Sequence, residues 1–234
     1  MSMIKDYPDF EKPREKALRY GIRTLSNREL LAILLRSGPR GQSVLETADL
    51  LLRKADGMKG IGRMSIAELC DIKGISRVKA LEMQACFEIV RRSYYEDAQS
   101  VDVISCPDHM IRWLRSELGS EMQEKFMAVY LDAGNRIISS RILFTGTINE
   151  AKVYPREVFR EALLAGCVSL ILVHNHPSGI LTPSMADIEL TERLIHAGKL
   201  MGVKVLDHLI ITGSGWLSMA GESMFRQTED GKDD

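Results

Sequence analysis

The sequence has no long apolar run. Its apolar stretches are short, as at residues 168–173, whereas a membrane-spanning helix needs roughly 18–20 consecutive apolar residues. The N-terminal segment also lacks the apolar stretch of a signal peptide. We therefore expect a protein without membrane contact that resides in the cytoplasm.

The sequence also has few cysteines, and none of them lie close together. The four stand at positions 70, 86, 106 and 167 without a Cys-x-x-Cys pair, so neither a zinc ribbon nor a disulfide framework is predicted. This cysteine usage is typical of a reducing compartment. The glycine-rich stretches lack a Gly-Lys-Ser or Gly-Lys-Thr ending, which excludes a P-loop for nucleotide binding.

In composition the chain is typical of a globular protein. Of its 234 residues, 45% are apolar and 27% charged, which excludes disordered and collagen-like classes and indicates one or two domains. Residues 1–100 carry 18 Lys and Arg against 14 Asp and Glu, a net charge of +4, whereas residues 101–234 carry 13 against 18, a net charge of −5. Different partners are therefore expected for the two halves, although so small an excess does not establish nucleic-acid binding.

Short helices are predicted for the first half of the chain. Segments beginning at Ser26 and Ser43 each have an N-cap serine, an acidic residue three places later and leucines at helical spacing. Two glycine turns follow, at residues 60–63 and 74–77, and no strand-like alternation occurs before residue 100. We expect residues 1–98 to form a small all-helical domain with a helix-hairpin-helix-like segment.

A mixed α/β domain is predicted over residues 103–225. Its expected elements, in order, are strands at 125–132 and 136–144, a helix at 155–166, a strand at 168–173, a helix at 184–201 and a strand at 203–211. The order β-β-α-β-α-β predicts a mixed sheet flanked by helices. The polar residues 91–100 are expected to be a linker or an extension of the preceding helix, and residues 226–234 a polar tail.

The strongest chemical signal is a pair of histidines where a strand ends. His174 and His176 follow an apolar run, and alternate strand residues point to the same side. Asp187 stands in the first turn of the next helix, which a Pro-Ser-Gly turn brings back toward the strand end. Two imidazoles and one carboxylate leave a fourth tetrahedral position open for water, which is typical of catalytic zinc. The sequence therefore predicts a zinc site.

Each part of this segment also has a simpler explanation. A lone His-x-His is commonly surface or turn chemistry. Ser184 and Asp187 form a good capping box, in which the serine and the acid satisfy free N–H groups at the helix start. A capping box does not require two strand-end histidines opposite it, however, so the combination favours a metal site.

The segment resembles a known family. The spacing His174-x-His176, seven residues, Ser184, two residues, Asp187 is similar to the JAMM motif of MPN/JAB zinc metallohydrolases. The wider sequence resembles the bacterial RadC family (UPF0758) over nearly the whole chain. Four blocks carry this likeness: FTGTIN at 144–149, YPREVFREAL at 154–163, HNHPSG at 174–179 and LDHLII at 206–211. The resemblance implies an MPN/JAB-like fold with cytidine-deaminase-like layering.

The resemblance also implies roles for individual residues. His174, His176 and Asp187 match the ligands of one zinc ion per chain, and Ser184 matches the residue that holds the catalytic water or the oxyanion. The remaining member of the motif is an upstream glutamate acting as general base, for which Glu124 is the best match. Weaker matches for that glutamate are Glu121 and Glu157.

The function expected from this resemblance is hydrolysis of an amide or isopeptide bond in a protein or peptide-like substrate. The alternative is a DNA-associated protein, linked to repair or recombination, whose MPN domain is catalytically idle. Of the other histidines, His208 is expected to be a satisfied strand histidine or a hydrogen-bond partner of a ligand. His109 and His196 are expected at the surface.

A second resemblance concerns nucleic acid. The segment from Asp71 resembles half of a helix-hairpin-helix motif, in which backbone N–H groups at a helix start bind DNA phosphate. Its candidate contact residues are Lys73, Gly74, Ser76, Arg77 and Lys79. Serine replaces the second glycine of that motif, so a glycine turn formed for packing reasons is an equally good interpretation.

Overall fold

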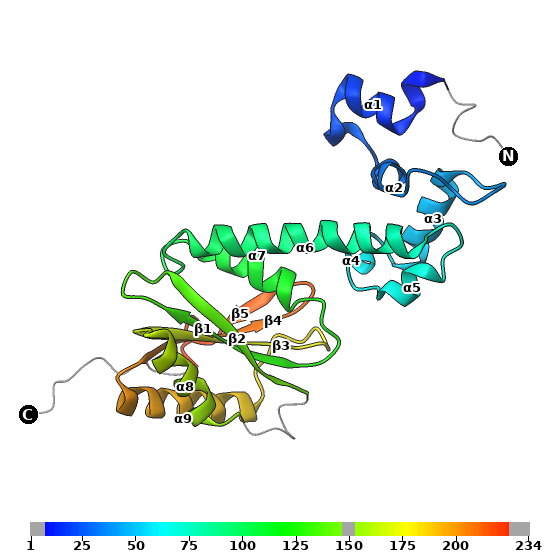
Figure 1. The fold of residues 1–234 in the computed structure, drawn as a ribbon. Helices are drawn as coiled ribbons and strands as arrows, with labels where there is room; N and C mark the ends of the chain where they lie inside the picture. Colours follow the sequence, from blue (N-terminus) through cyan, green and yellow to red (C-terminus); the bar gives the residue numbers. More distant parts are fainter. Residues whose placement is uncertain (1–7, 147–152, 225–234) are drawn as a thin grey trace, which may run out of the picture. The chain divides into compact units, whose positions relative to one another are not determined.

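The computed structural model describes residues 8–146 and 153–224 (Figure 1). By their internal contacts they form two compact units, Met1–Val90 and Arg91–Asp234. The predicted combination of a helical N-terminal part and a mixed α/β part is confirmed. The predicted polar tail at 226–234 lies outside the described residues.

The N-terminal unit consists of helices, and its described residues contain no strand. The elements are η2 (Asp9–Glu11), α1 (Pro13–Tyr20), η3 (Ile22–Thr24), α2 (Asn27–Leu35), α3 (Val44–Lys54), α4 (Met58–Ile61), α5 (Ile66–Cys70) and the first part of α6 (Arg77–Gln99). Both predicted capping boxes are present, at the starts of α2 and α3, and Ser65 with Glu68 forms a third at α5. These caps supply acceptors for N–H groups that lack a partner inside the helix.

Apolar faces of these helices form one core. Leu35 of α2, Leu51 of α3 and Ile61 of α4 are fully buried against Met83 of α6. α2 packs closely on α3, as the spacing of their leucines predicts. The unit is therefore stabilised by ordinary hydrophobic packing, with polar side chains concentrated at the helix starts.

The polar stretch expected to be a linker is helical. α6 continues without interruption to Gln99, so the alternative of an extended helix holds and the linker interpretation is wrong. Two of its residues, Tyr95 and Ala98, pack into the core of the C-terminal unit. The polar residues of this stretch form the exposed side of a helix whose other side is buried.

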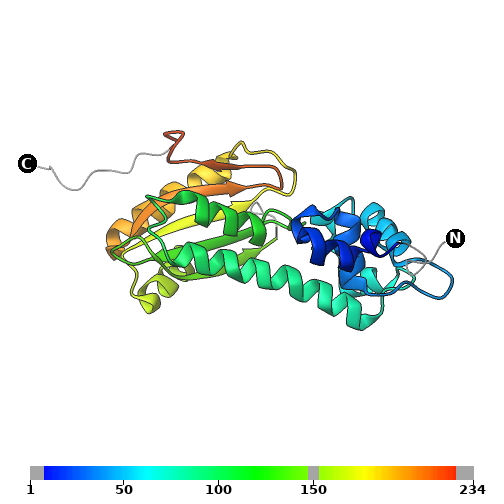
Figure 2. The ribbon, with the colours of Figure 1, turned by 90° about the horizontal axis from the view of Figure 1, so that it is seen from above.

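The C-terminal unit is a five-stranded mixed sheet covered by helices on both faces. Its elements are α7 (Pro107–Glu117), β1 (Lys125–Leu131), β2 (Ile137–Thr145), α8 (Pro155–Ala165), β3 (Ser169–Asn175), α9 (Met185–Met201), β4 (Lys204–Ile211) and β5 (Trp216–Ser218). The strand order is β2-β1-β3-β4-β5, and β3 and β4 form the one parallel pair of this sheet. α8 and α9 cover one face, and α7 with the last turns of α6 covers the other (Figures 1 and 2).

The central position of β3 explains its composition. All seven residues of β3 are buried, because helices cover both faces and strands pair with both edges. α7 and β5 were not predicted from the sequence. In the part of the chain that the structure describes, no helix has the length and apolar character needed to span a bilayer.

Candidate metal centre

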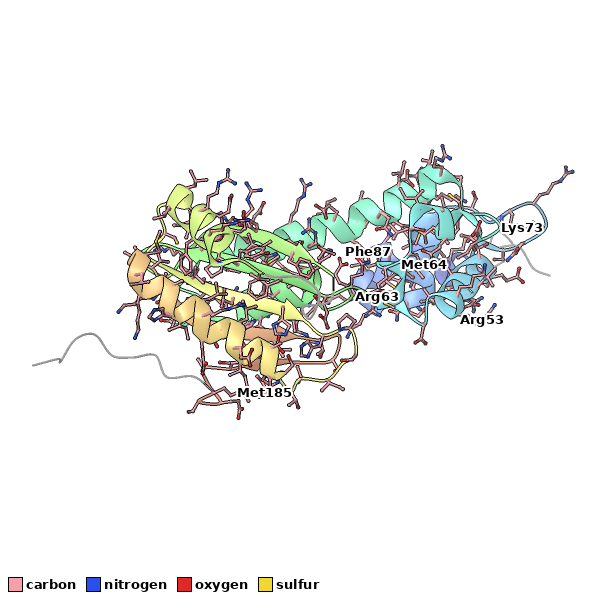
Figure 3. The ribbon with its side chains drawn as sticks, turned by 90° about the horizontal axis from the view of Figure 1, so that it is seen from below. Arg53, Arg63, Met64, Lys73, Phe87 and Met185 are labelled. Atoms are coloured by element: carbon pink, nitrogen blue, oxygen red, sulfur yellow. The ribbon has the colours of Figure 1, made fainter. Side chains whose placement is uncertain are left out.

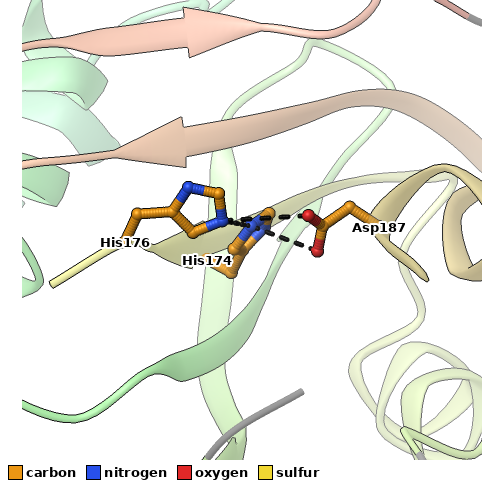
Figure 4. A group of neighbouring side chains, drawn as sticks. All are labelled: His174, His176 and Asp187. Atoms are coloured by element: carbon orange, nitrogen blue, oxygen red, sulfur yellow. Dashed lines mark hydrogen bonds and ion pairs between the residues drawn. The ribbon is translucent and has the colours of Figure 1, made fainter. Parts of the chain in front are cut away.

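The predicted metal ligands meet at the C-terminal end of β3. His174 is the last but one residue of that strand, and His176 follows it with its backbone N–H donated to the Ile211 carbonyl of β4 (2.9 Å). Asp187 lies in the first turn of α9, which begins next to the strand end. Strand, turn and helix start thus bring the three side chains together, as predicted (Figure 4).

The three ligand atoms lie at separations suited to one metal ion. Nε2 of His174 is 2.8 Å from Nε2 of His176 and 3.3 Å from Oδ1 of Asp187. Nε2 of His176 is 3.8 Å from Oδ2 of Asp187. Tetrahedral zinc with bonds of about 2.1 Å separates its ligand atoms by about 3.4 Å, a value in the middle of these distances. The spacing of these side chains could therefore hold one zinc ion.

The Nε2 atoms of His174 and His176 contact each other, and the hydrogen bond on the far side of His176 determines which of its nitrogens carries the hydrogen. Nδ1 of His176 lies 2.6 Å from the backbone oxygen of Ile180, which only accepts, so the ring hydrogen of His176 is on Nδ1. In the neutral ring Nε2 then presents a lone pair toward His174. Oδ1 of Asp187 is buried and has no hydrogen-bond partner. Buried acceptors of this kind are costly unless a cation or a proton lies between them.

The environment keeps His174 and Asp187 in the protonation states that metal binding needs. Burial lowers the pKa of His174 from 6.5 to about 4, against the opposing effect of Asp187, so this ring is neutral at pH 7. Burial acts to raise the pKa of Asp187, but its interactions with His176, His174 and Ser184 outweigh burial and lower it. The pKa of His176 is raised, chiefly by its hydrogen bond with Asp187, so in the metal-free site a proton competes with a metal for this ring.

Ser184 is the N-cap of α9, as the capping-box interpretation predicts. Its backbone N–H donates to Oδ2 of Asp187 (2.7 Å), and its hydroxyl donates to the same oxygen (2.6 Å). The capping box and the ligand group are therefore one structure, since one oxygen of Asp187 serves the helix start and the other faces His174. The role of Ser184 toward a water or an oxyanion stays a prediction.

Glu124 immediately precedes β1, the strand that pairs with β3. β1 and β3 are antiparallel with Phe126 opposite His174, so continuing this register places Glu124 opposite His176 and on the same face. The charge of Glu124 also contributes to the raised pKa of His176. Glu121 and Glu157 form ion pairs with Lys125 (2.8 Å) and Arg156 (3.0 Å). Of the three predicted glutamates, Glu124 is thus the one whose position near His176 is supported by the register of β1 with β3 and by its effect on the pKa of His176.

Two residues next to the candidate ligands were not predicted from the sequence. Asn175, between the two histidines, accepts from Lys125 N–H (2.7 Å) and donates to the Gln123 carbonyl (3.0 Å), which fixes the backbone on both sides of Glu124. Thr191 of α9 is fully buried and lies behind the ligands. Neither has a distinctive local signal, because each acts through a contact made only in the folded chain.

The remaining histidines differ from one another. His208 of β4 is fully buried, and its Nε2 lies 2.8 Å from Nδ1 of His174, so it is a hydrogen-bond partner of that candidate ligand. His196 is exposed, as expected. His109 is half-buried rather than fully at the surface, and its Nδ1 is buried without a hydrogen-bond partner.

The five candidate DNA-contact residues surround the start of α6. Lys73, Ser76 and Arg77 are exposed, and Figure 3 shows Lys73 on the N-terminal unit. Lys79 is half-buried, and its ammonium group donates to the carbonyls of Ser37 (2.6 Å) and Gly74 (2.8 Å). Burial lowers its pKa, with a further contribution from Arg36. DNA binding stays a prediction for this segment.

The glycines of both turns have packing reasons. A Cβ atom on Gly74, whose φ is +99°, would lie 2.5 Å from Cδ of Pro39. A Cβ atom on Gly60 would lie 1.5 Å from the carbonyl oxygen of Ala55. Glycine is required at these positions whether or not DNA binds.

Comparison with known proteins gives matches over both units. A family model described as "RadC-like JAB domain" matches residues 104–224, and one described as "UPF0758 N-terminal" matches residues 4–81. A UPF0758 protein of Bacillus licheniformis is 43% identical over 216 residues, which cover 92% of this chain and 96% of the relative. A UPF0758 protein of Dechloromonas aromatica is 44% identical over 212 residues, covering 90% and 94%. UPF0758 protein YsxA of Bacillus subtilis is 42% identical over 216 residues, covering 92% and 94%.

Proposed function

The chain belongs to the UPF0758 family of proteins with a RadC-like JAB domain, and on this premise we propose that it is a zinc-dependent hydrolase of amide or isopeptide bonds. The observation that carries the proposal is the convergence of two imidazole nitrogens and the unpartnered Oδ1 of Asp187 at the end of β3. Three ligands of this kind leave a position for water, as catalytic zinc sites do.

His174, His176 and Asp187 would hold one zinc ion per chain. Zinc bound there supplies a water with a pKa near 7 and polarises the substrate carbonyl. The low pKa of His174 and the lowered pKa of Asp187 keep both ligands ready to bind at neutral pH. A protein or peptide-like substrate fits this chemistry.

Glu124 is the general base of the proposal. Its carboxylate takes a proton from the attacking water and delivers it to the leaving amine. The bonds of Asn175 to the backbone at 123 and 125 hold the main chain on both sides of this residue. Ser184 orients Asp187 through its hydroxyl and N–H groups. As the resemblance implies, this hydroxyl would turn from Asp187 to donate to a developing oxyanion.

The first test is the zinc content of the purified, metal-replete protein, measured by elemental analysis. We expect about one zinc per chain in the wild type and a loss of zinc in the double variant His174→Ala/His176→Ala. Full zinc retention in His176→Ala would contradict the ligand assignment. Little zinc in the wild type would leave the capping box as the better explanation and would favour the DNA-associated alternative.

The second test separates catalysis from metal binding. We expect Glu124→Gln to keep its zinc and to lose hydrolysis of fluorogenic peptide amides and lysine-linked isopeptides. Glu157→Gln is the matched control, because Glu157 is an exposed glutamate paired with Arg156. Unchanged hydrolysis by Glu124→Gln would remove it as the general base.

A further inference from the structure

Three buried side chains behind the metal centre form a continuous chain of hydrogen bonds. Nδ1 of His174 lies 2.8 Å from Nε2 of His208, and Nδ1 of His208 lies 2.6 Å from Oγ1 of Thr191. Oγ1 of Thr191 also lies 2.6 Å from the backbone oxygen of Asp187. His174, His208 and Thr191 are each 0% exposed, so solvent does not compete for these contacts.

The carbonyl of Asp187 sets the direction of every bond in this chain. A carbonyl oxygen only accepts, so the one hydroxyl hydrogen of Thr191 points to it. Oγ1 of Thr191 must then accept from His208, whose ring hydrogen is therefore on Nδ1. A neutral imidazole carries one ring hydrogen, so Nε2 of His208 is an acceptor and Nδ1 of His174 is its donor. The lone pair of His174 is left on Nε2, facing His176 and Asp187.

We propose that His208 and Thr191 are positioning residues that hold His174 in the tautomer a metal requires. The proposal rests on the proposed function, because it assigns these residues a task toward the metal of that site. Metal-bound histidines usually donate their second N–H to a carboxylate, a carbonyl or water. Here a neutral imidazole accepts it, and that imidazole is oriented by the helix that carries Asp187. The ligand on β3 and the ligand on α9 are thereby coupled through β4.

The arrangement also explains why His208 is a histidine. The position needs an acceptor toward His174 and a donor toward Thr191, which the two nitrogens of one neutral ring provide in a fully buried place. Phe126 packs edge-on against this ring at 5.6 Å between centroids, which helps to fix its orientation.

The test is Thr191→Val, which has nearly the same shape but offers no acceptor. In this variant a hydrogen on Nδ1 of His208 is a buried donor without an acceptor. Moving that hydrogen to Nε2, where it donates to His174, removes the unpaired donor and forces the hydrogen of His174 onto its own Nε2. Long-range 15N–1H NMR of the metal-free protein at pH 8 distinguishes the two tautomers. We expect Nδ1–H on His174 in the wild type and in Thr191→Ser, and Nε2–H in Thr191→Val.

Zinc affinity, measured by competition with a chromophoric chelator, is the second readout. Loss of such an outer partner typically weakens binding about 10–100-fold, so we expect that loss in Thr191→Val and recovery in Thr191→Ser. Circular dichroism controls for folding. An Nε2–H tautomer in the wild type overturns the proposal, and so does unchanged zinc affinity in folded Thr191→Val.

These readouts separate this inference from the proposed function. If Thr191→Val does not fold, the wild-type tautomer still decides the proposal. If the protein binds zinc but hydrolyses none of the test substrates, the proposed function fails while the tautomer result stands. If the wild type shows the expected tautomer but binds no zinc, the metal task proposed for His208 and Thr191 is wrong.

Discussion

The two units of this protein bury polar groups in different ways. Among the described residues of the N-terminal unit, the buried polar side chains are Ser43 and Thr47, both hydroxyls in the first turn of α3. The C-terminal unit buries two histidines, an aspartate, an asparagine and three hydroxyl-bearing residues: His174, His208, Asp187, Asn175, Ser169, Thr191 and Thr212. Four of these seven, namely His174, Asp187, His208 and Thr191, belong to the candidate metal centre or to its hydrogen-bond partners, and Asn175 bonds to the backbone on both sides of Glu124.

This difference shows where stability and chemistry are located. Burying a polar group costs free energy unless it is fully hydrogen-bonded. In the N-terminal unit Nε of Arg28 is buried without a hydrogen bond, but it is ion-paired with Asp49 at 3.1 Å. The C-terminal unit accepts this cost at one end of β3, where an unpartnered carboxylate oxygen remains. Such concentrations of buried titratable groups are typical of functional sites.

The largest expected effect is that of zinc on the C-terminal unit. Ligand binding at 1,000 times its dissociation constant stabilises a protein by about 4 kcal/mol. Calorimetry with and without a chelator should therefore shift the unfolding of the sheet unit, and Asp187→Ala should abolish the shift. Equal shifts in both units, or a persisting shift in Asp187→Ala, would contradict the contrast between the units.

The next prediction concerns a substitution that destabilises the N-terminal core and leaves the candidate metal centre unchanged. Leu51→Ala removes a fully buried side chain of α3, and such changes cost about 3 kcal/mol. Denaturant unfolding should show this loss while zinc stoichiometry stays unchanged. Leu18→Ala is the matched control, since Leu18 is 83% exposed, and its effect should stay within about 0.5 kcal/mol.

A smaller loss is expected at the glycine turn before α6. Gly41 and Gly74 both have positive φ values, but only Gly74 lies against Pro39. An alanine in this region of φ costs about 1–2 kcal/mol. Urea titration of both variants should therefore find Gly74→Ala less stable than Gly41→Ala. Equal stabilities would mean that the contact with Pro39 relaxes without cost.

Two capping boxes of similar geometry permit a finer comparison. Ser65 accepts from the N–H of Glu68 at 3.2 Å, and Ser184 accepts from the N–H of Asp187 at 3.2 Å. Replacing either serine by alanine should cost about 1 kcal/mol of stability. Only Ser184→Ala should also weaken zinc binding, measured by chelator competition, because Ser184 also bonds the ligand carboxylate. An equal change of zinc affinity in Ser65→Ala would indicate an indirect effect.

The fold could be predicted where its signals are local. Serine caps at 26 and 43, the all-buried run of β3 and the proline and glycine bounds of α8 are each encoded by neighbouring residues. α7 also carries such signals, with proline in its first turn and buried Met110 and Leu114 at helical spacing. β5 is three residues long and is defined by its pairing with β4, so the sequence alone does not predict it.

The site divides in the same way. His174, His176 and Asp187 lie within one segment of fourteen residues, so their proximity could be predicted from their spacing in the sequence. The partnership of His208 with His174 depends on the register of β3 against β4, which no local pattern encodes. The sequence ranks Glu124 above Glu121 and Glu157, but the register that directs it toward His176 depends on the pairing of β1 with β3, which no local pattern encodes.

The smallest expected effect is a change in the salt dependence of DNA binding. It tests whether the N-terminal unit binds DNA. Lys79 donates to two backbone carbonyls, so Lys73 and Arg77 are the basic side chains of this turn that remain exposed. Each phosphate contact contributes about 0.9 to the slope of log affinity against log salt concentration. If the turn binds DNA, Lys73→Ala/Arg77→Ala should lower that slope by about 2, whereas Lys79→Met should reduce stability instead. Filter binding at two salt concentrations measures this slope. If the wild type does not bind DNA at low salt, the DNA interpretation is wrong. The turn then has only the packing role indicated by the close contact of Gly74 with Pro39.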